Sequence, residues 1–199
     1  PWLTKAAVHA IATSKDGDFL AVGGGYLYDN EVHIYRWNLK TREYDKVWDS
    51  GDGIIKGDVL SLAFGDTDNN KFMDIAVGSA DGHIYVFEQR HIYDPFTRTE
   101  NQFEHVWTSP KMRPVFSVAI EDTDKDGVLD ILAGSWDGKV RAYEYRKHSG
   151  YPFSREHWIQ YEEVWSSGDF IKDKVTAITT ADTNYNGLPE IIAGTRNGS

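Results

Sequence analysis

Residues 115–145 read VFSVAIEDTDKDGVLDILAGSWDGKVRAYEY. The segment opens with VFSVAI, in which apolar and small side chains alternate, and an acidic stretch follows. DILAGS then begins a second apolar run. The dipeptide Asp137-Gly138, which favours a two-residue β-turn, separates this run from KVRAYEY. The pattern predicts three short antiparallel strands, and a fourth, EEVWSS, follows after a longer connection.

The plan of this segment recurs along the chain. Copies start at Val8, Val59, Val115 and Val175, so that the starts lie 51, 56 and 60 residues apart. A second landmark recurs in step as VWDSGD, VWTSPK and VWSSGD. No segment combines a sustained 3.6-residue period with helix caps, so we expect almost no helix. Four-stranded units repeated at intervals of this size are typical of a β-propeller.

The predicted fold class is therefore all-β, a single β-propeller or a fragment of one, with about 3.5 four-stranded antiparallel blades. The blades are expected at about residues 8–50, 59–109, 115–167 and, incomplete, 175–199. A run of hairpins in a β-sandwich is the alternative, and the common register of the landmarks disfavours it. Because propellers close with about four to eight blades, we expect further blades or self-association to cover the open faces.

Three acidic loops each follow the first strand of a copy. Oxygen-bearing side chains fall at loop positions 1, 3, 5 and 9: Asp66, Asp68, Asn70 and Asp74; Asp122, Asp124, Asp126 and Asp130; Asp182, Asn184, Asn186 and Glu190. The backbone carbonyl at position 7, in Phe72, Val128 or Leu188, can add another oxygen. Hard oxygen ligands in this number suit Ca²⁺, whereas Mg²⁺ prefers fewer protein ligands, and zinc prefers His and Cys. The loops therefore predict up to three calcium sites.

An EF-hand and a metal-free turn are the two alternatives to a calcium loop between strands. An EF-hand needs a bidentate Glu at position 12 and flanking helices, but position 12 is Val77 or Ala133 and the flanks are strands. Asp/Asn-rich turns without metal are the remaining alternative, and three loops in register favour calcium. The second loop has the most carboxylates. It also has Gly127 at position 6, where the first loop has Lys71. We therefore expect the strongest calcium binding at Asp122–Asp130. The shorter loop of the first copy, TSKDGDF, is expected to hold no metal.

The second copy, FGDTDNNKFMDIAVGSADGHIYVF, resembles the FG-GAP (VCBS-type) repeat of the integrin α-subunit propeller. Phe64-Gly65 matches the pair that names the repeat, and the later copies depart from it with Ile120-Glu121 and Thr180-Ala181. The resemblance covers residues 59–199. It implies an extracellular or cell-surface propeller, commonly of seven blades, that serves adhesion or ligand recognition and takes calcium at the loop positions given above. Residues 1–50 look more like a generic WD40 or quinoprotein-type blade.

Composition limits the classes of function. The 199 residues are 40% hydrophobic and 26% charged, as in a globular protein with a sizeable core. The formal net charge of −10 argues against a general nucleic-acid binder, and no apolar run approaches the roughly 18 residues needed to cross a bilayer. Without cysteine, disulfides and thiolate chemistry are excluded. The repeated Trp48, Trp107 and Trp165 are expected to pack between blades.

These observations predict a calcium-stabilised binding or adhesion module, secreted or at the cell surface, with a protein or glycan ligand and no catalytic activity of its own. The chain contains no G-x-S-x-G, P-loop or helical His-pair motif. Two alternatives stay open. A polysaccharide-acting lyase or hydrolase would need a carboxylate, Lys or Arg cluster in the central funnel. An intracellular WD40-like protein-interaction scaffold is favoured by the missing cysteines and by the first blade.

Overall fold

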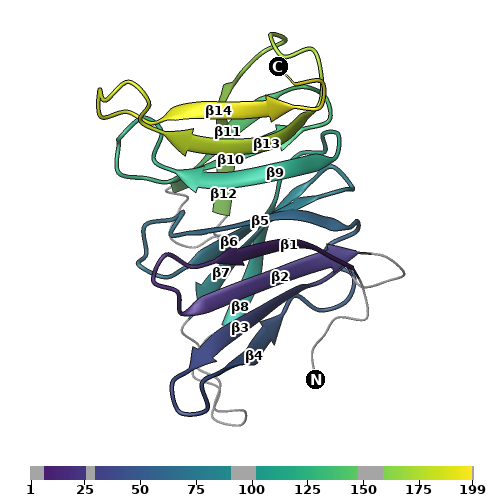
Figure 1. The fold of residues 1–199 in the computed structure, drawn as a ribbon, viewed down its shortest axis with the longest axis vertical. Coiled ribbons are helices and arrows are strands. Elements are labelled where there is room, and N and C mark those ends of the chain that lie inside the picture. Colours follow the sequence, from purple (N-terminus) through teal and green to yellow (C-terminus); the bar gives the residue numbers. More distant parts are fainter. Residues whose placement is uncertain (1–6, 26–29, 91–101, 148–158, 199) are drawn as a thin grey trace, which may run out of the picture.

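The computed structural model describes residues 7–25, 30–90, 102–147 and 159–198. These residues form fourteen β-strands and no helix, and Figure 1 shows the sheets stacked along the long axis of the molecule. Three sheets have four strands each, in the orders β1-β2-β3-β4, β5-β6-β7-β8 and β9-β10-β11-β12, and a fourth sheet holds β13 and β14. Every pair is antiparallel. The prediction of an all-β fold built from four-stranded antiparallel blades is confirmed.

The strands are short and have similar lengths from blade to blade. Their bounds in the first two sheets are β1 Ala7–Thr13, β2 Phe19–Gly25, β3 Val32–Asn38, β4 Glu43–Asp49, β5 Val59–Gly65, β6 Asp74–Ser79, β7 Ile84–Arg90 and β8 Gln102–Thr108. In the other two they are β9 Val115–Glu121, β10 Asp130–Ser135, β11 Val140–Lys147, β12 Ile159–Ser166, β13 Val175–Ala181 and β14 Glu190–Thr195.

The first strands of successive sheets lie side by side: β1 beside β5, β5 beside β9, and β9 beside β13 (Figure 1). Side-chain hydroxyls join them, because the Val118 amide donates to Ser61 Oγ at 2.9 Å and the Ile178 amide donates to Ser117 Oγ at 2.9 Å. Each hydrogen bond joins a backbone amide of one blade to a serine hydroxyl of the preceding blade. The inner strands are thereby fixed in register around the axis of the fold.

A glycine in the second strand makes room for a valine of the next blade. A Cβ built on Gly78 would lie 3.0 Å from Val115, and one built on Gly134 would lie 2.5 Å from Val175; Gly23 meets Val59 in the same way. The three valines are fully buried. The recurring A-V-G and L-A-G sequences of the second strands therefore let the blades approach closely.

The apolar core lies between the blades. One buried cluster joins the first and second blades around Ile75, Tyr85 and Phe87, and another joins the second and third around Trp107 and Tyr143. Such packing explains the strands whose every residue is buried, because both faces of a middle blade are covered. Within the described part of the chain, no helix is long and apolar enough to span a membrane.

Candidate metal centre

The acidic loops connect the first two strands of the second, third and fourth sheets. Figure 1 shows the β5–β6, β9–β10 and β13–β14 loops on the same side of the stack of sheets, together with the β1–β2 loop. Antiparallel pairing places position 9 of each loop opposite the residue that precedes position 1, as in the pairs Glu121↔Asp130 and Ala181↔Glu190 at the strand ends. The repeat thus places three carboxylate-rich loops along one edge of the molecule.

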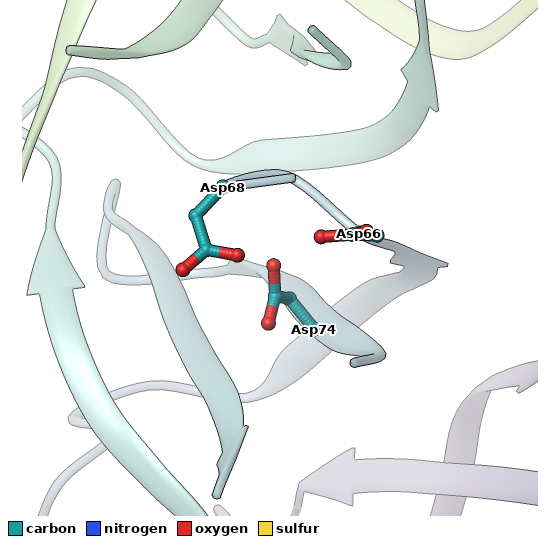
Figure 2. A group of neighbouring side chains, drawn as sticks. All are labelled: Asp66, Asp68 and Asp74. Atoms are coloured by element: carbon teal, nitrogen blue, oxygen red, sulfur yellow. The ribbon is translucent and has the colours of Figure 1, made fainter. Parts of the chain in front are cut away.

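The first loop gathers three carboxylates. Oxygen atoms of Asp66, Asp68 and Asp74 all lie within 4.8 Å of one another, and Figure 2 shows the carboxylates of Asp68 and Asp74 facing each other with Asp66 beside them. Asp66 also closes the turn, because it accepts hydrogen bonds from the backbone amides of Asn70 at 2.9 Å and Lys71 at 2.8 Å. Its oxygens therefore point inward before any ligand is added.

Thr67, at position 2 of this loop, holds the carboxylate at position 9. Asp74 Oδ2 accepts hydrogen bonds from the Thr67 amide at 2.8 Å and from Thr67 Oγ1 at 2.6 Å. The Thr67 hydroxyl also lies 2.6 Å from the hydroxyl of Tyr161, on β12 of the next blade. Because the single Thr67 hydroxyl proton is directed at Asp74, Tyr161 donates to Thr67. The loop is therefore linked to the neighbouring blade.

The other oxygen of Asp74 has no hydrogen-bond partner among the described residues, although Asp74 is 0% exposed. Glu88, opposite Asp74 on β7, is 1% exposed. Its Oε2 lies 2.8 Å from Arg90 Nη2, and its Oε1 has no partner in the same described part of the chain. Burial, together with the charge of Asp68, raises the pKa of Asp74 and of Glu88 to about 7 in each case. Hydrogen bonds from Thr67 to Asp74 and the charge of Arg90 near Glu88 oppose this rise.

The donor set of the first loop fits a hard divalent cation. It offers carboxylate and amide oxygens, a buried oxygen that no described residue pairs with, and negative charge that the surrounding described residues neutralise only in part. Burying an uncompensated carboxylate is costly, and a bound cation removes that cost. No His or Cys belongs to the cluster, which again disfavours zinc.

The second loop has the same plan but is more open to solvent. Oxygens of Asp122, Asp124 and Asp126 lie within 4.8 Å of one another. Asp130 is not a member of this group. It accepts a hydrogen bond from the Thr123 amide at 3.1 Å, and also from the Thr123 hydroxyl. Burial raises the pKa of Asp130. Asp122 Oδ1 is buried and finds no hydrogen-bond partner within the described ranges, as Asp74 Oδ1 finds none in the first loop.

The third loop gathers fewer carboxylates and is exposed. Asp182 accepts hydrogen bonds from the amides of Asn186 at 3.0 Å and Gly187 at 2.9 Å, and Glu190 is held by Thr183 at 2.7 and 2.6 Å. Hydrogen bonds from Thr183 lower the pKa of Glu190. Asn184 and Asn186 supply amide oxygens in place of carboxylates, so this loop offers the weakest charge to a cation.

Backbone angles show how the three loops turn. Position 6 has a positive φ in each loop, at Lys71 (74°), Gly127 (93°) and Gly187 (90°). Glycine adopts this region without strain, whereas Lys71 does not. Position 4 also has a positive φ, as at Lys125 (63°), a second turn that spacing alone did not indicate. The roles of the carbonyls of Phe72, Val128 and Leu188, and the order of affinities among the loops, stay predictions.

The residues that support the loops were not among those predicted from the sequence. Thr67, Thr123 and Thr183 occupy position 2 and bind the position-9 carboxylate, and their recurrence in D-T-D and D-T-N was the available signal. Tyr161 and Glu88 come from other strands, so their approach to the first loop depends on tertiary structure. Neither could be assigned from the local motif.

Comparisons with known proteins identify the fold. No protein-family model and no curated protein matches the chain. The chain is similar to the crystal structure of Saccharomyces cerevisiae Sqt1, with 15% identity and a TM-score of 0.65 over 97% of this chain and 43% of that one. It is also similar to Chaetomium thermophilum Sqt1, with 19% identity and a TM-score of 0.59 over 88% of this chain and 38% of that one. The described residues form part of a β-propeller.

A third structure, of Chaetomium thermophilum Sqt1 bound to the N-terminus of the ribosomal protein L10, is 20% identical with a TM-score of 0.58. It covers 87% of this chain and 40% of that one. In all three cases the chain spans less than half the length of the propeller that it matches. At these identities the similarity establishes the propeller fold, whose blades are the four-stranded sheets described above.

The comparisons correct the expectations drawn from the FG-GAP resemblance. The matched propellers are structures of Sqt1, one of them with a segment of a ribosomal protein, so the integrin-like assignment and the extracellular, secreted and adhesive expectations were wrong. A short acidic loop between two strands is a local motif, and it does not decide which class of propeller carries it. Calcium binding by the loops is not tested by these comparisons.

Proposed function

We propose that the chain is part of an intracellular, WD40-like protein-interaction scaffold that binds a segment of a partner protein and performs no chemistry on it. The propeller fold and the solved complex of Sqt1 with a ribosomal protein N-terminus support this class of function. The observation that carries it is a hollow at the end of the blades opposite the acidic loops. Its lining has the composition of a protein-binding surface.

This hollow, here called the turn-side hollow, lies between the second and third blades and has a volume of about 500 Å³. Its lining combines apolar, aromatic and charged side chains: Pro110, Lys111, Met112, Arg113, Asp137, Arg141, Tyr143 and Glu163. Arg, Tyr and Met are enriched at protein interfaces, where they supply contact area together with directed hydrogen bonds. A hollow of this composition fits an inserted side chain from a partner segment.

The charges of the hollow indicate the chemistry of that segment. Arg141 is already neutralised, because it donates to Asp137 Oδ2 at 2.6 Å and lies 3.7 Å from Glu163. Within the described residues, Lys111 and Arg113 form no ion pair, and both are exposed. The side chains that line the hollow therefore carry a net positive charge. We infer that the partner segment carries a carboxylate that reaches Lys111 and Arg113.

The residue before Asp137 in the chain is an exposed tryptophan. Trp136 remains 43% exposed and stacks on Phe116 with ring centroids 5.5 Å apart. Lys174 Nζ lies 3.0 Å from the centroid of the Trp136 ring. Partly exposed tryptophans are among the residues that dominate binding energy at protein interfaces, so Trp136 is a second candidate contact for a partner.

A displayed library of random peptides tests the proposal. We expect the native chain to enrich peptides that contain Asp or Glu, and we expect Lys111→Ala/Arg113→Ala to weaken their binding at least about tenfold. A matched control is Lys15→Ala/Lys40→Ala, which removes two exposed lysines of the first blade. Enriched peptides that bind the Lys111/Arg113 variant as tightly as the native chain would overturn this assignment.

We further propose that a divalent cation, with Ca²⁺ the best fit, occupies the first two acidic loops and stabilises the blades around them. The observation that carries this proposal is the buried Asp74 Oδ1 of the carboxylate cluster, which has no hydrogen-bond partner in the part of the chain that the structure describes. A cation bound only by the folded chain adds its binding free energy to folding, about 2.7 kcal/mol at a hundred times its Kd. The bound ion would neutralise the loop and keep its turns in place.

Calorimetric titration with CaCl₂ and thermal unfolding in Ca²⁺ or EDTA test the cation site. We expect heat of binding and a Tm higher by several degrees in Ca²⁺, with Asp68→Asn removing part of both. Asp52→Asn, an exposed aspartate outside the loops, is the matched control. Equal melting in Ca²⁺ and EDTA, without heat of binding, would show that the loops are solvated turns. That result would leave the protein-interaction proposal standing.

A further inference from the structure

A buried glutamate faces the first acidic loop from outside the loop. Glu88 on β7 is the cross-strand partner of Asp74, which holds position 9 of the loop on β6. Side chains of directly paired residues lie on the same face of a sheet, with Cβ atoms about 4.5–5.5 Å apart. Asp74 is 0% exposed and Glu88 is 1% exposed, and each has a carboxylate oxygen without a hydrogen-bond partner among the described residues. Two carboxylates placed together away from water repel each other.

Glu88 shares one space with two carboxylates of the loop. Burial, followed by the charges of Asp68, Asp74 and Glu88, raises the pKa of both Tyr145 and Tyr161 on the third blade. The same two phenol groups are therefore close to all three carboxylates. The space lies between the second and third blades, and Glu88 faces it together with the loop.

One arginine neutralises this group of carboxylates only in part. Arg90 Nη2 lies 2.8 Å from Glu88 Oε2, and Arg90 Nε lies 3.5 Å from the exposed carboxylate of Glu104. Among the residues that the structure describes, no cationic side chain forms an ion pair with Asp68 or Asp74. The charge that remains is negative, and a divalent cation would balance it.

The third blade repeats the arrangement at the same place on its third strand. There Glu144 is 4% exposed, and its Oε2 lies 2.8 Å from Arg146 Nη2. Burial raises the pKa of Glu144, three carboxylates of the second acidic loop raise it further, and Arg146 opposes the rise. The E-x-R sequences of β7 and β11 thus accompany the two loops that gather three carboxylates each.

The first blade, which has the short loop, shows the converse. Counted four residues before the close-contact glycine of the second strand, the position of Asp74 is held by Phe19. The cross-strand partner of Phe19 is Arg36, whose guanidinium carbon lies 5.7 Å from the centroid of the Phe19 ring. Within one chain, the third-strand glutamate is therefore present beside two carboxylate-rich loops and replaced by a cation beside the short loop.

We propose that Glu88 is part of the first cation site, where its carboxylate faces the bound ion from β7 and strengthens binding. Glu144 has the same role beside the second loop. The cation site is then built from the sheet of the blade as well as from the loop, and the ion balances charge on both β6 and β7. This inference rests on the proposed cation site and is independent of the proposed partner binding.

Calorimetric titration with CaCl₂ tests the role of Glu88 in binding. A full-length chain with Asp122→Asn, Asp124→Asn and Asp126→Asn reports the first loop, because the second loop then lacks the three carboxylates that it gathers. In this chain we expect Glu88→Gln to raise the Kd for Ca²⁺ at least about tenfold, since it removes a negative charge that faces the ion. Glu104→Gln is the matched control. Glu104 lies beside the same arginine but its side chain is 63% exposed, so we expect less than about a twofold change.

Thermal unfolding in EDTA separates a cation-site residue from a glutamate that serves only the fold through its ion pair with Arg90. Without the ion, Glu88 is a buried carboxylate that one shared arginine balances incompletely. Glu88→Gln should therefore leave the Tm in EDTA unchanged or raise it, and should remove at least about half of the rise in Tm that Ca²⁺ produces.

Two results would overturn the inference, and they differ in what they say of the cation site. If the native chain binds Ca²⁺, but Glu88→Gln keeps the native Kd and melts at a lower temperature in EDTA, Glu88 serves the fold alone. The proposed cation site would stand in that case. If the native chain gives no heat of binding and melts equally in Ca²⁺ and EDTA, the cation site and the role of Glu88 fail together.

Discussion

The hydroxyl of Tyr161 lies 2.6 Å from Oγ1 of Thr67, although the two residues are 94 positions apart in the chain. Through Thr67 the contact continues to Asp74, so one hydrogen-bonded chain joins the outer strand of the third blade to the acidic loop of the second. Such a buried connection couples the order of the loop to the packing of the neighbouring blade.

Tyr161→Phe should reveal the strength of this connection. The ring stays in its aromatic contacts with Trp107, and only the hydroxyl is removed, so we expect a loss of about 1 kcal/mol in the free energy of unfolding. Urea unfolding of the variant, of Thr67→Val and of the double variant measures the coupling. An additive double variant would show that the two hydroxyls do not interact.

Tyr145→Phe provides the control for that measurement. Tyr145 contacts Tyr161 at 5.7 Å between ring centroids, but its hydroxyl forms no hydrogen bond within the described residues. Its removal should change the free energy of unfolding by less than about 0.5 kcal/mol. A loss as large as that of Tyr161→Phe would indicate that the effect comes from the rings.

Most of the fold could be predicted from the sequence because the determining signals are local and repeated. Alternating apolar residues, the Asp-Gly turns and the VW landmark each lie within a few residues, and their common spacing indicated four-stranded units. The structure adds how these units meet. The close contacts of Gly134 with Val175 and of Trp107 with Tyr143 join separate blades, and no local pattern specifies them.

The candidate site could be predicted only in part. Counting oxygen ligands at alternate positions identified Asp66, Asp68 and Asp74, which the structure brings together. The same counting treated Asp130 like Asp74, but Asp130 lies outside the group of Asp122, Asp124 and Asp126. Spacing along the chain does not show which carboxylates converge, because that depends on the positions of the side chains in three dimensions.

Gly134→Ala should destabilise the chain because the new Cβ would lie 2.5 Å from Val175 Cγ1 and 2.8 Å from Ile178 Cδ1. Overpacking of this kind costs about 1–3 kcal/mol, which urea unfolding would detect. Gly194→Ala is the matched control, since its nearest neighbour, the Ala177 Cβ, is 3.7 Å away. Equal losses for both variants would mean that backbone flexibility, and not the close approach of the blades, decides the effect.

Asp137→Asn should weaken the fold at neutral pH. Burial alone would raise the pKa of Asp137, but hydrogen bonds from Arg141 and Ser135 outweigh it and hold the pKa below 3.8. A carboxylate with a lowered pKa stabilises the fold above its unfolded pKa, and this contribution is lost as pH falls through the folded value. We expect the variant to lose about 1.5–3 kcal/mol at pH 7 in urea unfolding, and the difference from the native chain to shrink toward pH 2.5.

Asp169→Asn is the control for the pH series. Asp169 pairs with Lys139 at 3.0 Å, but its side chain is almost fully exposed, so the pair is screened by solvent. We expect no resolvable change in unfolding at either pH. If the Asp137 variant showed the same difference from the native chain at pH 7 and pH 2.5, the loss would not come from the ionised carboxylate.

Trp107→Ala and Trp165→Ala should differ although the two residues occupy equivalent positions in their blades. Trp107 is buried between Tyr143 and Tyr161, and deleting a buried tryptophan costs about 3–5 kcal/mol. Trp165 is more exposed to water than Trp107 and buries less apolar surface. Its deletion should therefore cost under about 1.5 kcal/mol in the free energy of unfolding of the 199-residue chain. Urea unfolding compares the free energies of the two variants. A cost for Trp165→Ala as large as that for Trp107→Ala would show that the exposure of the ring does not decide the loss.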